Sequence, residues 1–370
     1  MPEDKKAATG RIEVVCDGDG DGDGSTSDVR ALSFAYPLRL ISASAHPANR
    51  RHRSVYVLGH GGGVLQTDHT RLSVRVAGRG ASLALLTQGN TKIYKSNSIS
   101  SADTNSTTAA ATVVPAHTSR ADVHARVSGG ALLCVLPDPV TPFRGASHLS
   151  SQVVELADHT ASLLFLDWAS AGRVHYRDSP PPTPPPTNEP STTETSAVNK
   201  PSIDELYKQN ERWDFASVQL RARISVAAAP VFRDRLVLDT QALKALRVSS
   251  NNTNCVLTLV LIGPRTATIV DHIQQRLKET AAAGGGGGGK KRVLGVQDPL
   301  WSYSPLAPSD VDYSFLSEAE QLRQKMLQNG GVVRAVASSV LVMRAFVKDL
   351  IKDLHLEIGE DLFSHINDLK

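Results

Sequence analysis

Three similar strand–turn–strand segments constrain the fold of this chain more than any other feature of its sequence. They lie at residues 74–85, 123–135 and 154–165, and in each an alternating strand leads through a glycine or aspartate turn into an apolar strand. Period-two alternation places every second side chain on one buried face. Units of this kind bury that face only against their neighbours, which predicts layered or stacked sheets. Ordinary β-hairpins in a sandwich are the alternative.

Helical periodicity appears mainly late in the sequence. Apolar residues between Val340 and Leu354 follow the i, i+3, i+4 rule behind Ser339, a suitable N-cap, and Gly359 can end the helix. Two further helices are expected at 270–280 and 318–327. The pattern therefore predicts a mainly β protein with a few α-helices packed at one side.

Composition narrows the class of protein. The 370 residues are 41% hydrophobic with a formal net charge of +3, which is too small to indicate nucleic-acid binding. Three widely spaced cysteines argue against a disulfide framework and for a reducing compartment. The N-terminus lacks the apolar core of a signal peptide, and the longest apolar run, 256–262, is too short to span a membrane. We expect a soluble, cytoplasmic protein with no nucleic-acid or membrane partner.

Four low-complexity stretches look like insertions into a single domain of residues 1–370. They lie at about 17–28, 98–112, 179–202 and 281–291, and they are rich in Asp-Gly, Ser/Thr/Ala, proline and glycine respectively. The first has the aspartate spacing of a calcium loop, but a strand rather than a helix precedes it. A solvated loop is the better interpretation.

The stretch VLGHGGGVLQTDH at 57–69 combines a glycine run with ionisable side chains. It lacks the Lys-Ser or Lys-Thr pair of a phosphate loop, and a strand rather than a dinucleotide-binding helix follows it. A tight turn in which the glycines adopt positive φ is the simplest interpretation; these are Gly61, Gly62 and Gly63. The alternative is a metal site of a metal-dependent hydrolase, formed by His60, Asp68 and His69.

Taken in order, several motifs resemble the UreD family of urease accessory proteins, called UreH in some systems. They are YPLRLI from Tyr36, VYVLGHGGGVLQTD at 55–68, LLTQGNTKIYKS at 85–96, LPDPVTPFRGASH at 136–148, Trp168 with Gly172-Arg173, ERWDF at 211–215, and GGVVRAVA at 330–337. Thr67 and Asn210 stand where the family usually has glycine. The proline-rich insertion separates the Gly-Arg and Glu elements, and we expect it to loop out without disturbing neighbouring strands.

The resemblance implies a layered, β-helix-like stack of strands and a non-enzymatic scaffold without catalytic residues. Such proteins bind apo-urease and a UreF-like protein, which recruits a UreG-like GTPase. They hold no tight cofactor, and nickel passes through them in transit.

Ionisable residues at the matching motif positions are the candidates for this nickel route: Asp68, Lys92, Asp138 and Glu211. The resemblance implies transient nickel contact at Asp68 and Glu211, with Lys92 pairing with one of the carboxylates. The helix near the C-terminus is the expected docking element for the UreF-like partner.

Overall fold

The described part of the chain is built around two mixed β-sheets. The computed structural model describes residues 7–17, 26–43, 50–95, 118–174, 211–248, 253–284, 299–308, 311 and 313–359. In spatial order, the seven-stranded sheet contains β14 (Ala229–Leu238), β13 (Ser217–Val226), β11 (Ser147–Leu156), β8 (Ser119–Val127), β5 (His69–Ala77), β1 (Ala8–Asp17) and β2 (Thr26–Phe34). The ten-stranded sheet contains β16 (Leu300–Pro305), β17 (Gly331–Ala337), β15 (Cys255–Ile262), β12 (Ser162–Ser170), β9 (Leu132–Leu136), β6 (Ser82–Leu86), β4 (His52–Gly59) and β3 (Leu38–Ser42), with β10 (Val140–Pro142) and β7 (Thr91–Ile93) paired beside β12.

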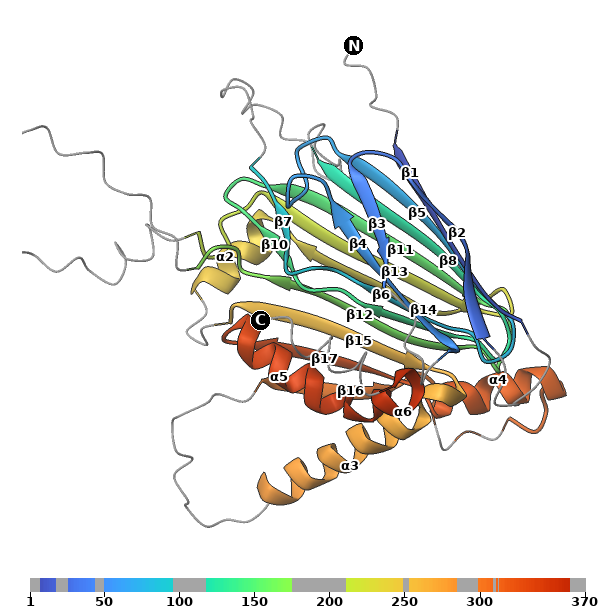
Figure 1. The fold of residues 1–370 in the computed structure, drawn as a ribbon. Helices are drawn as coiled ribbons and strands as arrows, with labels where there is room; N and C mark the ends of the chain where they lie inside the picture. The colour runs from blue at the N-terminus through green and yellow to red at the C-terminus, as the bar shows by residue number, and fades with distance from the viewer. Residues whose placement is uncertain are drawn as a thin grey trace, which may run out of the picture.

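The three repeated segments cross from one sheet to the other. The first strands, β5, β8 and β11, pair in parallel in the seven-stranded sheet, whereas the second strands, β6, β9 and β12, pair in parallel in the ten-stranded sheet. The segments are therefore not hairpins, and the mainly β, layered class is confirmed (Figure 1). The more specific β-helix-like description stays a prediction.

The register aligns apolar side chains into rows that run across the seven-stranded sheet. Val76 of β5 lies opposite Val14 and Val127, and Leu156 continues the row to Val226. All five are buried in the core between the two sheets. Period-two alternation in the sequence therefore becomes one continuous apolar layer.

Glycine is required where β5 turns into β6. Gly78 has φ +89°, and a Cβ there would lie 2.5 Å from the carbonyl oxygen of Cys16. Only a residue without a side chain can combine this conformation with so close a backbone approach.

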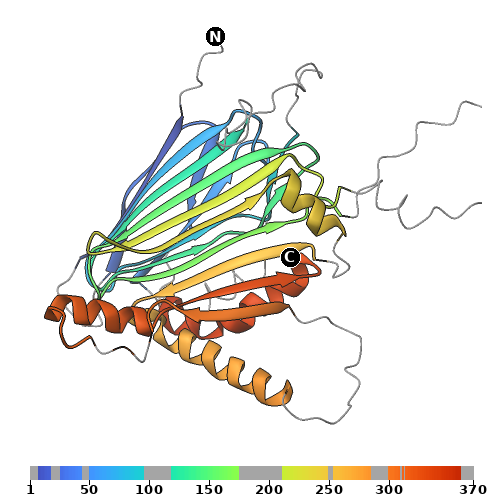
Figure 2. The ribbon, with the colours of Figure 1, turned by 180° about the vertical axis from the view of Figure 1, so that it is seen from behind.

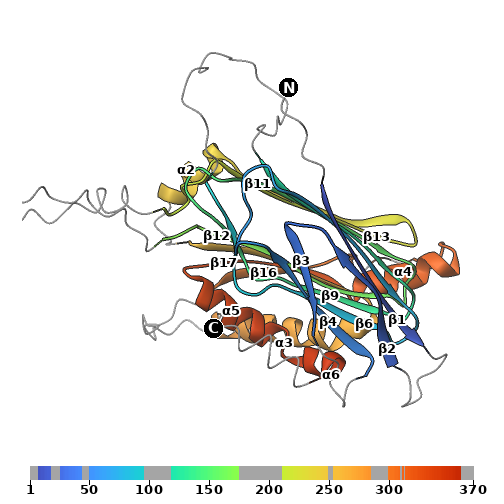
Figure 3. The same cartoon turned by 45° about the horizontal axis from the view of Figure 1, so that its top comes forward.

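Helices cover the other face of the ten-stranded sheet, which gives three layers (Figure 3). β6, β9 and β12 are buried along their whole length because both faces of this sheet are covered. A second core lies between β9, β12, β15 and β17 and the helices on that side.

The predicted helices are found, with altered ends. The described helices are α2 (Thr240–Val248), α3 (Ala267–Gly284), α4 (Glu318–Gln328), α5 (Val340–Leu350) and α6 (His355–Ile358), with short 3₁₀ turns at Pro264–Thr266 and Lys352–Leu354. The predicted late helix is thus divided into α5, a turn and α6. The Ser339 side chain accepts the Val342 N–H at 3.2 Å as the expected N-cap, and Gly359 follows α6 with φ +90°. The sequence did not predict α2.

None of the helices in the described ranges is long and apolar enough to cross a membrane. The predicted insertions fall largely on residues 18–25, 96–117, 175–210 and 285–298, which lie outside the described residues. Two flanking aspartates of the calcium-like repeat are described. Asp17 pairs with Arg30, and Asp28 lies 3.6 Å from Arg53.

Candidate functional site

Motifs that are far apart in the sequence meet at one end of the two sheets. The Val64 N–H donates to the Lys92 carbonyl at 2.8 Å, which joins the glycine-rich turn to β7. Lys92 lies opposite Thr141 of β10, and β10 in turn pairs with β12. In Figure 1 this end is marked by the labels β7, β10 and α2.

The glycine run is a tight turn, but its three members have different roles. Gly61 and Gly62 have φ of +84° and +74°, as expected. Gly63 does not have a positive φ, which corrects our expectation. A Cβ at Gly63 would lie 2.7 Å from the Lys92 carbonyl oxygen, so close approach to β7 requires glycine there.

Asp68 caps this turn. Its Oδ2 accepts the Leu65 N–H at 2.8 Å, and its backbone carbonyl accepts the Arg120 N–H at 2.8 Å. The side chain is half-buried, and it reaches the surface beside the turn. Asp68 therefore has a structural role in this turn.

The three residues of the hydrolase alternative do not form one group. His60 is exposed with its ring 5.4 Å from that of Tyr36, while His69 lies 2.8 Å from Asp122 on β8. Within the described ranges, no three His, Cys, Asp or Glu side chains are placed to hold a metal ion together. The geometry gives the hydrolase alternative no assembled site.

Asp138 is a buried carboxylate held by the C-terminal helix α5. It is 7% exposed, and its Oδ1 lies 2.5 Å from Nη2 of Arg344. Arg344 also donates to Asn90 at 3.1 Å, so it joins two of the matched motifs. Burial raises the pKa of Asp138 above its ordinary value, and the positive charge of Arg344 opposes that rise.

Glu211 is a second buried carboxylate, 3% exposed, and Arg173 binds both of its oxygens. The Arg173 Nε and Nη2 donate at 2.7 and 2.5 Å, and the guanidinium lies 4.2 Å from the centre of the Phe143 ring. Gly172 permits this approach because a Cβ there would lie 2.9 Å from the Glu211 carbonyl oxygen. The pair thus joins the two segments that flank residues 175–210. The neighbouring strands, β12 before and β13 after, are both formed, as expected of an insertion that leaves neighbouring strands undisturbed.

Lys92 differs from its expected role. Its side chain is exposed on β7, and it forms no ion pair with any residue that the structure describes. Arginines occupy the positions beside the buried carboxylates instead: Arg344 at Asp138 and Arg173 at Glu211.

Comparison with known proteins extends the likeness beyond the separate motifs to most of the chain. A family model described as "UreD urease accessory protein" matches residues 8–179 and 206–361. The chain belongs to the UreD family. Members of this family are urease accessory proteins that take part in nickel activation of urease, and they act as non-catalytic scaffolds.

Individual relatives support the same assignment. "Urease accessory protein UreD" of Anaeromyxobacter sp. is 27% identical over 362 residues, covering 97% of this chain and 89% of the relative. "Urease accessory protein UreD" of Sorangium cellulosum is 27% identical over 328 residues, covering 89% and 76%. "Urease accessory protein 4" of Cryptococcus neoformans is 29% identical over 260 residues, covering 65% and 67%.

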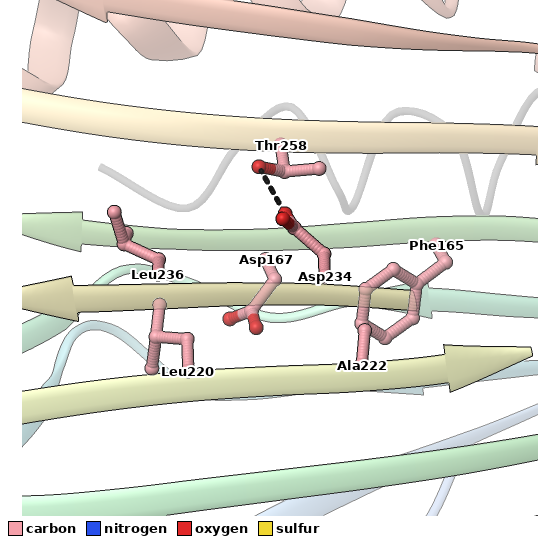
Figure 4. A pocket seen from close by; sticks show the side chains of 7 residues that line it. All are labelled: Phe165, Asp167, Leu220, Ala222, Asp234, Leu236 and Thr258. Atoms are coloured by element: carbon pink, nitrogen blue, oxygen red, sulfur yellow. Dashed lines mark hydrogen bonds between the residues drawn. The ribbon is translucent and has the colours of Figure 1, made fainter. Parts of the chain in front are cut away.

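This UreD chain holds a third buried carboxyl group, which sequence reasoning missed. Asp167 lines a cavity of about 10 Å³ between the sheets, shown in Figure 4. Asp234 of β14 lies in the same cavity, where it accepts a hydrogen bond from Thr258 at 3.5 Å and pairs with Arg334 at 3.0 Å. Burial, and then the charge of Asp234, raises the pKa of Asp167 to about 7.

Other buried polar groups of this UreD chain gather where β8, β11 and β13 begin. The His148 Nδ1 lies 2.9 Å from the Ser119 hydroxyl, and burial lowers the pKa of His148 to about 4. Arg212 donates to the Asn254 side chain at 2.6 Å. Arg212 lies within the matched motif ERWDF, whereas Ser119 and Asn254 lie in none. The one sequence signal for His148 is its place at the end of LPDPVTPFRGASH.

Proposed function

We propose that this UreD-family chain is a cytoplasmic scaffold that binds apo-urease and a UreF-like protein, through which a UreG-like GTPase joins the complex. Family membership supports the role in urease activation. The observation that carries the rest is the meeting of four separate family motifs at one polar end of the sheets. Nickel is the cargo here, and the chain holds no cofactor tightly.

We propose further that nickel passes this end along Asp68, Lys92, Asp138 and Glu211. Asp138 and Glu211 are buried carboxylates, which cost free energy unless they are paired or solvated. An arginine pairs with each of these residues, so an incoming ion has to compete with a guanidinium for both oxygens of Glu211 and for Oδ1 of Asp138. Such competition weakens ion binding, as transit requires. Asp68 and Glu211 make the transient contacts.

Exposed Lys92 has a different part in this route. Its backbone carbonyl accepts the Val64 N–H of the glycine-rich turn, and β10 pairs with β7, so the side chain stands on the strand that links that turn to β10. A positive charge there disfavours lasting capture of a cation near Asp68.

Nickel-limited activation of urease tests the route. In a strain that lacks the chain's gene, urease protein should accumulate without activity, and the wild-type chain should restore activity. The variants Asp68→Ala and Glu211→Gln should fold and bind the UreF-like partner, yet lower the nickel content and activity of urease. Asp214→Asn is the matched control, because Asp214 is paired with Arg144 at 2.7 Å outside the route. Normal activation by both route variants at limiting nickel would show that the two carboxylates are structural.

The UreF-like partner docks, in this proposal, on the outer side of α5 and α6. α5 buries Met343, Phe346 and Leu350 against the ten-stranded sheet, whereas Leu341 is 77% exposed. Leu356 of α6 is 66% exposed on the same helical layer. Exposed leucines beside a buried helical face suit a helix-in-groove or helix-on-helix contact.

A point variant tests this docking better than truncation does. Removal of the chain after Gly331 would delete most of β17 and all of α5, both parts of the core. We expect Leu341→Glu to abolish capture of the UreF-like partner while the melting temperature stays unchanged. Leu322→Glu on α4, which is 38% exposed, is the control and should bind normally. Unchanged capture by Leu341→Glu would place the interface elsewhere.

A further inference from the structure

The outer face of the seven-stranded sheet carries a group of arginines that we call the arginine square: Arg221, Arg223, Arg233 and Arg235. Arg221 of β13 lies directly opposite Arg235 of β14, and Arg223 lies directly opposite Arg233. Like charges directly opposite each other destabilise a strand pair. Figure 2 shows this sheet from its outer side, and none of the helices drawn there crosses it.

Other arginines of this face have carboxylate partners: Arg11, Arg71, Arg75 and Arg126. Glu13 pairs with Arg11 and Arg75, at 2.7 and 3.1 Å. Asp122 and Glu155 provide the other carboxylates, with Glu155 lying 2.8 Å from Arg126. All the side chains of these pairs belong to β1, β5, β8 and β11. None of these carboxylates stands on β13 or β14, the last two strands at this edge of the sheet.

The arginine square has no acidic partner among the residues that the structure describes. The Gln219 Oε1 accepts hydrogen bonds from Arg221 at 2.8 Å and from Arg235 at 3.3 Å instead. The buried Nε of Arg221 has no hydrogen-bond partner in the described part of the chain. Asp234 belongs to the same hairpin but lines the inner cavity. Burial, followed by the charges of Arg235 and Arg120, lowers the pKa of Arg221.

We propose that the arginine square is a docking surface for a carboxylate-rich patch of a protein partner. Neighbouring strands lie about 4.8 Å apart, and alternate residues of a strand about 6.6 Å apart. The four guanidinium groups therefore present a broad, flat array rather than a pocket for a small anion. Planar guanidinium groups bind carboxylates through two parallel hydrogen bonds, and such contacts would remove the repulsion between the facing arginines.

A protein fits this surface better than a nucleic acid does. The outward positions of β13 and β14 around the square hold Gln219, Ser225 and Val237, and no described aromatic ring is available there for base stacking. A long polyanion that continued across the sheet would also meet Asp122 and Glu155. A compact acidic patch on a protein needs no aromatic rings for stacking and does not extend as far as these two carboxylates. This surface requires no nickel, so the inference goes beyond the nickel route.

The simpler alternative is a charged sheet edge. β14 is the edge strand of its sheet, and charged side chains on edge strands prevent pairing with other molecules. In that case the charges act by repulsion alone, and no specific anionic partner exists.

Binding of the full-length chain to immobilised poly-L-glutamate tests the proposal. Arg223→Gln/Arg233→Gln removes one facing pair, and Arg11→Gln/Arg75→Gln removes the same charge from the paired region, where both arginines are 62% exposed. We expect the first variant to weaken binding at least tenfold, about 1.4 kcal/mol, at roughly 0.1 M salt. The control should weaken binding less than threefold.

The melting temperature checks that folding is intact. The melting temperature of Arg223→Gln/Arg233→Gln, the square variant, should be no lower than that of the wild type, because the substitutions remove a pair of like charges. If it fails to fold, Arg223→Lys/Arg233→Lys keeps the charge and loses the bidentate geometry, and at least threefold weaker binding is expected. Full retention of binding by the lysine variant would overturn the proposed guanidinium contacts.

Three other results would overturn the proposal. The first is an equal loss of poly-L-glutamate binding in Arg223→Gln/Arg233→Gln and in its control, and the second is the absence of saturable binding by the wild type. Either result would mean that the arginines act only as a charged sheet edge. Tighter binding to a single-stranded oligonucleotide of equal charge, lost in the square variant, would make the partner a nucleic acid.

Discussion

The buried carboxyl group of Asp167 makes the stability of this protein depend on pH in a direction that can be tested. Burial and the nearby charge of Asp234 raise its pKa from 3.8 to about 7 in the folded protein. The folded protein therefore binds this proton more tightly than the unfolded chain does. This contribution to stability is complete below about pH 4, decreases as the pH rises toward 7, and is lost above 7.

The expected magnitude follows from the two pKa values. A difference of one between the pKa of the folded protein and that of the unfolded chain corresponds to about 1.4 kcal/mol, and the interval from pH 5 to the folded pKa of about 7 spans two pH units. Ionisation of Asp167 should therefore cost the wild type about 3 kcal/mol of unfolding free energy between pH 5 and pH 8. Asp167→Asn cannot ionise, so it should lack this loss. Thr258 and Arg334 reach Asp234 rather than Asp167, and thus do not neutralise the effect directly.

Urea unfolding at pH 5 and pH 8 measures the difference. Buried histidines such as His52, whose pKa burial lowers to about 3, affect wild type and variant alike, and the comparison between the two cancels them. The asparagine variant should gain about 3 kcal/mol relative to the wild type on going from pH 5 to pH 8. A constant difference between the two proteins across this range would refute the assigned burial of the charge.

Three further outcomes follow from the structure. Arg173→Ala should lower the free energy of unfolding by about 3–5 kcal/mol, because it leaves Glu211 buried and unpaired, and Arg173→Ala/Glu211→Gln should recover part of that loss in urea titrations. Thr67→Gly should raise the free energy of unfolding by up to about 1 kcal/mol in the same assay, because Thr67 has φ +68° and a β-branched residue is strained there. Cys134 should resist alkylation in the native state, since burial raises the pKa of its thiol to about 12; rapid labelling without unfolding would contradict its buried position.

Much of the fold was predictable because its regularity is local. Alternation in β1 and β5 and the N-cap at Ser339 depend on residues within a few positions of one another. The path that the chain takes between the two sheets was harder to predict from the sequence. A strand followed by a glycine turn and a second strand fits both a hairpin and a crossing to another sheet, and only the parallel partners decide between them.

The candidate site was predictable where a motif contains the residue, and not where its partner comes from elsewhere in the sequence. The family resemblance identified Asp138 and Glu211 as candidates. Arg344, which pairs with Asp138, lies on α5, and no motif or residue spacing in the sequence predicts that contact. Lys92 was a candidate because of its motif position and its charge, and neither shows whether a carboxylate lies beside the exposed side chain. Asp167 carries no sequence signal, because the residues around it come from the distant strands β13, β14 and β15.

Thr67 illustrates how a departure from the family pattern acquires a physical meaning. The position needs a left-handed backbone because Asp68 turns back to accept the Leu65 N–H. Glycine adopts that conformation freely, whereas threonine does so at a cost of about 1–2 kcal/mol. The hydrogen bond of Asp68 and the attachment of the turn to β7 offset this strain.

The pairing of Arg173 with Glu211 lets the fold accommodate a long insertion between these two residues. Closing a loop twice as long costs only about 0.6 kcal/mol more, so the length of a connection matters little once its ends are fixed. Here the ends are fixed by two charge-assisted hydrogen bonds to a carboxylate that is 3% exposed, and breaking such a pair costs several times as much, about 3–5 kcal/mol. The length of the connection can therefore change at little cost, whereas loss of Arg173 leaves the buried Glu211 carboxylate without this partner. The Arg173–Glu211 pair therefore contributes more to the stability of this end of the molecule than the length of the connection does.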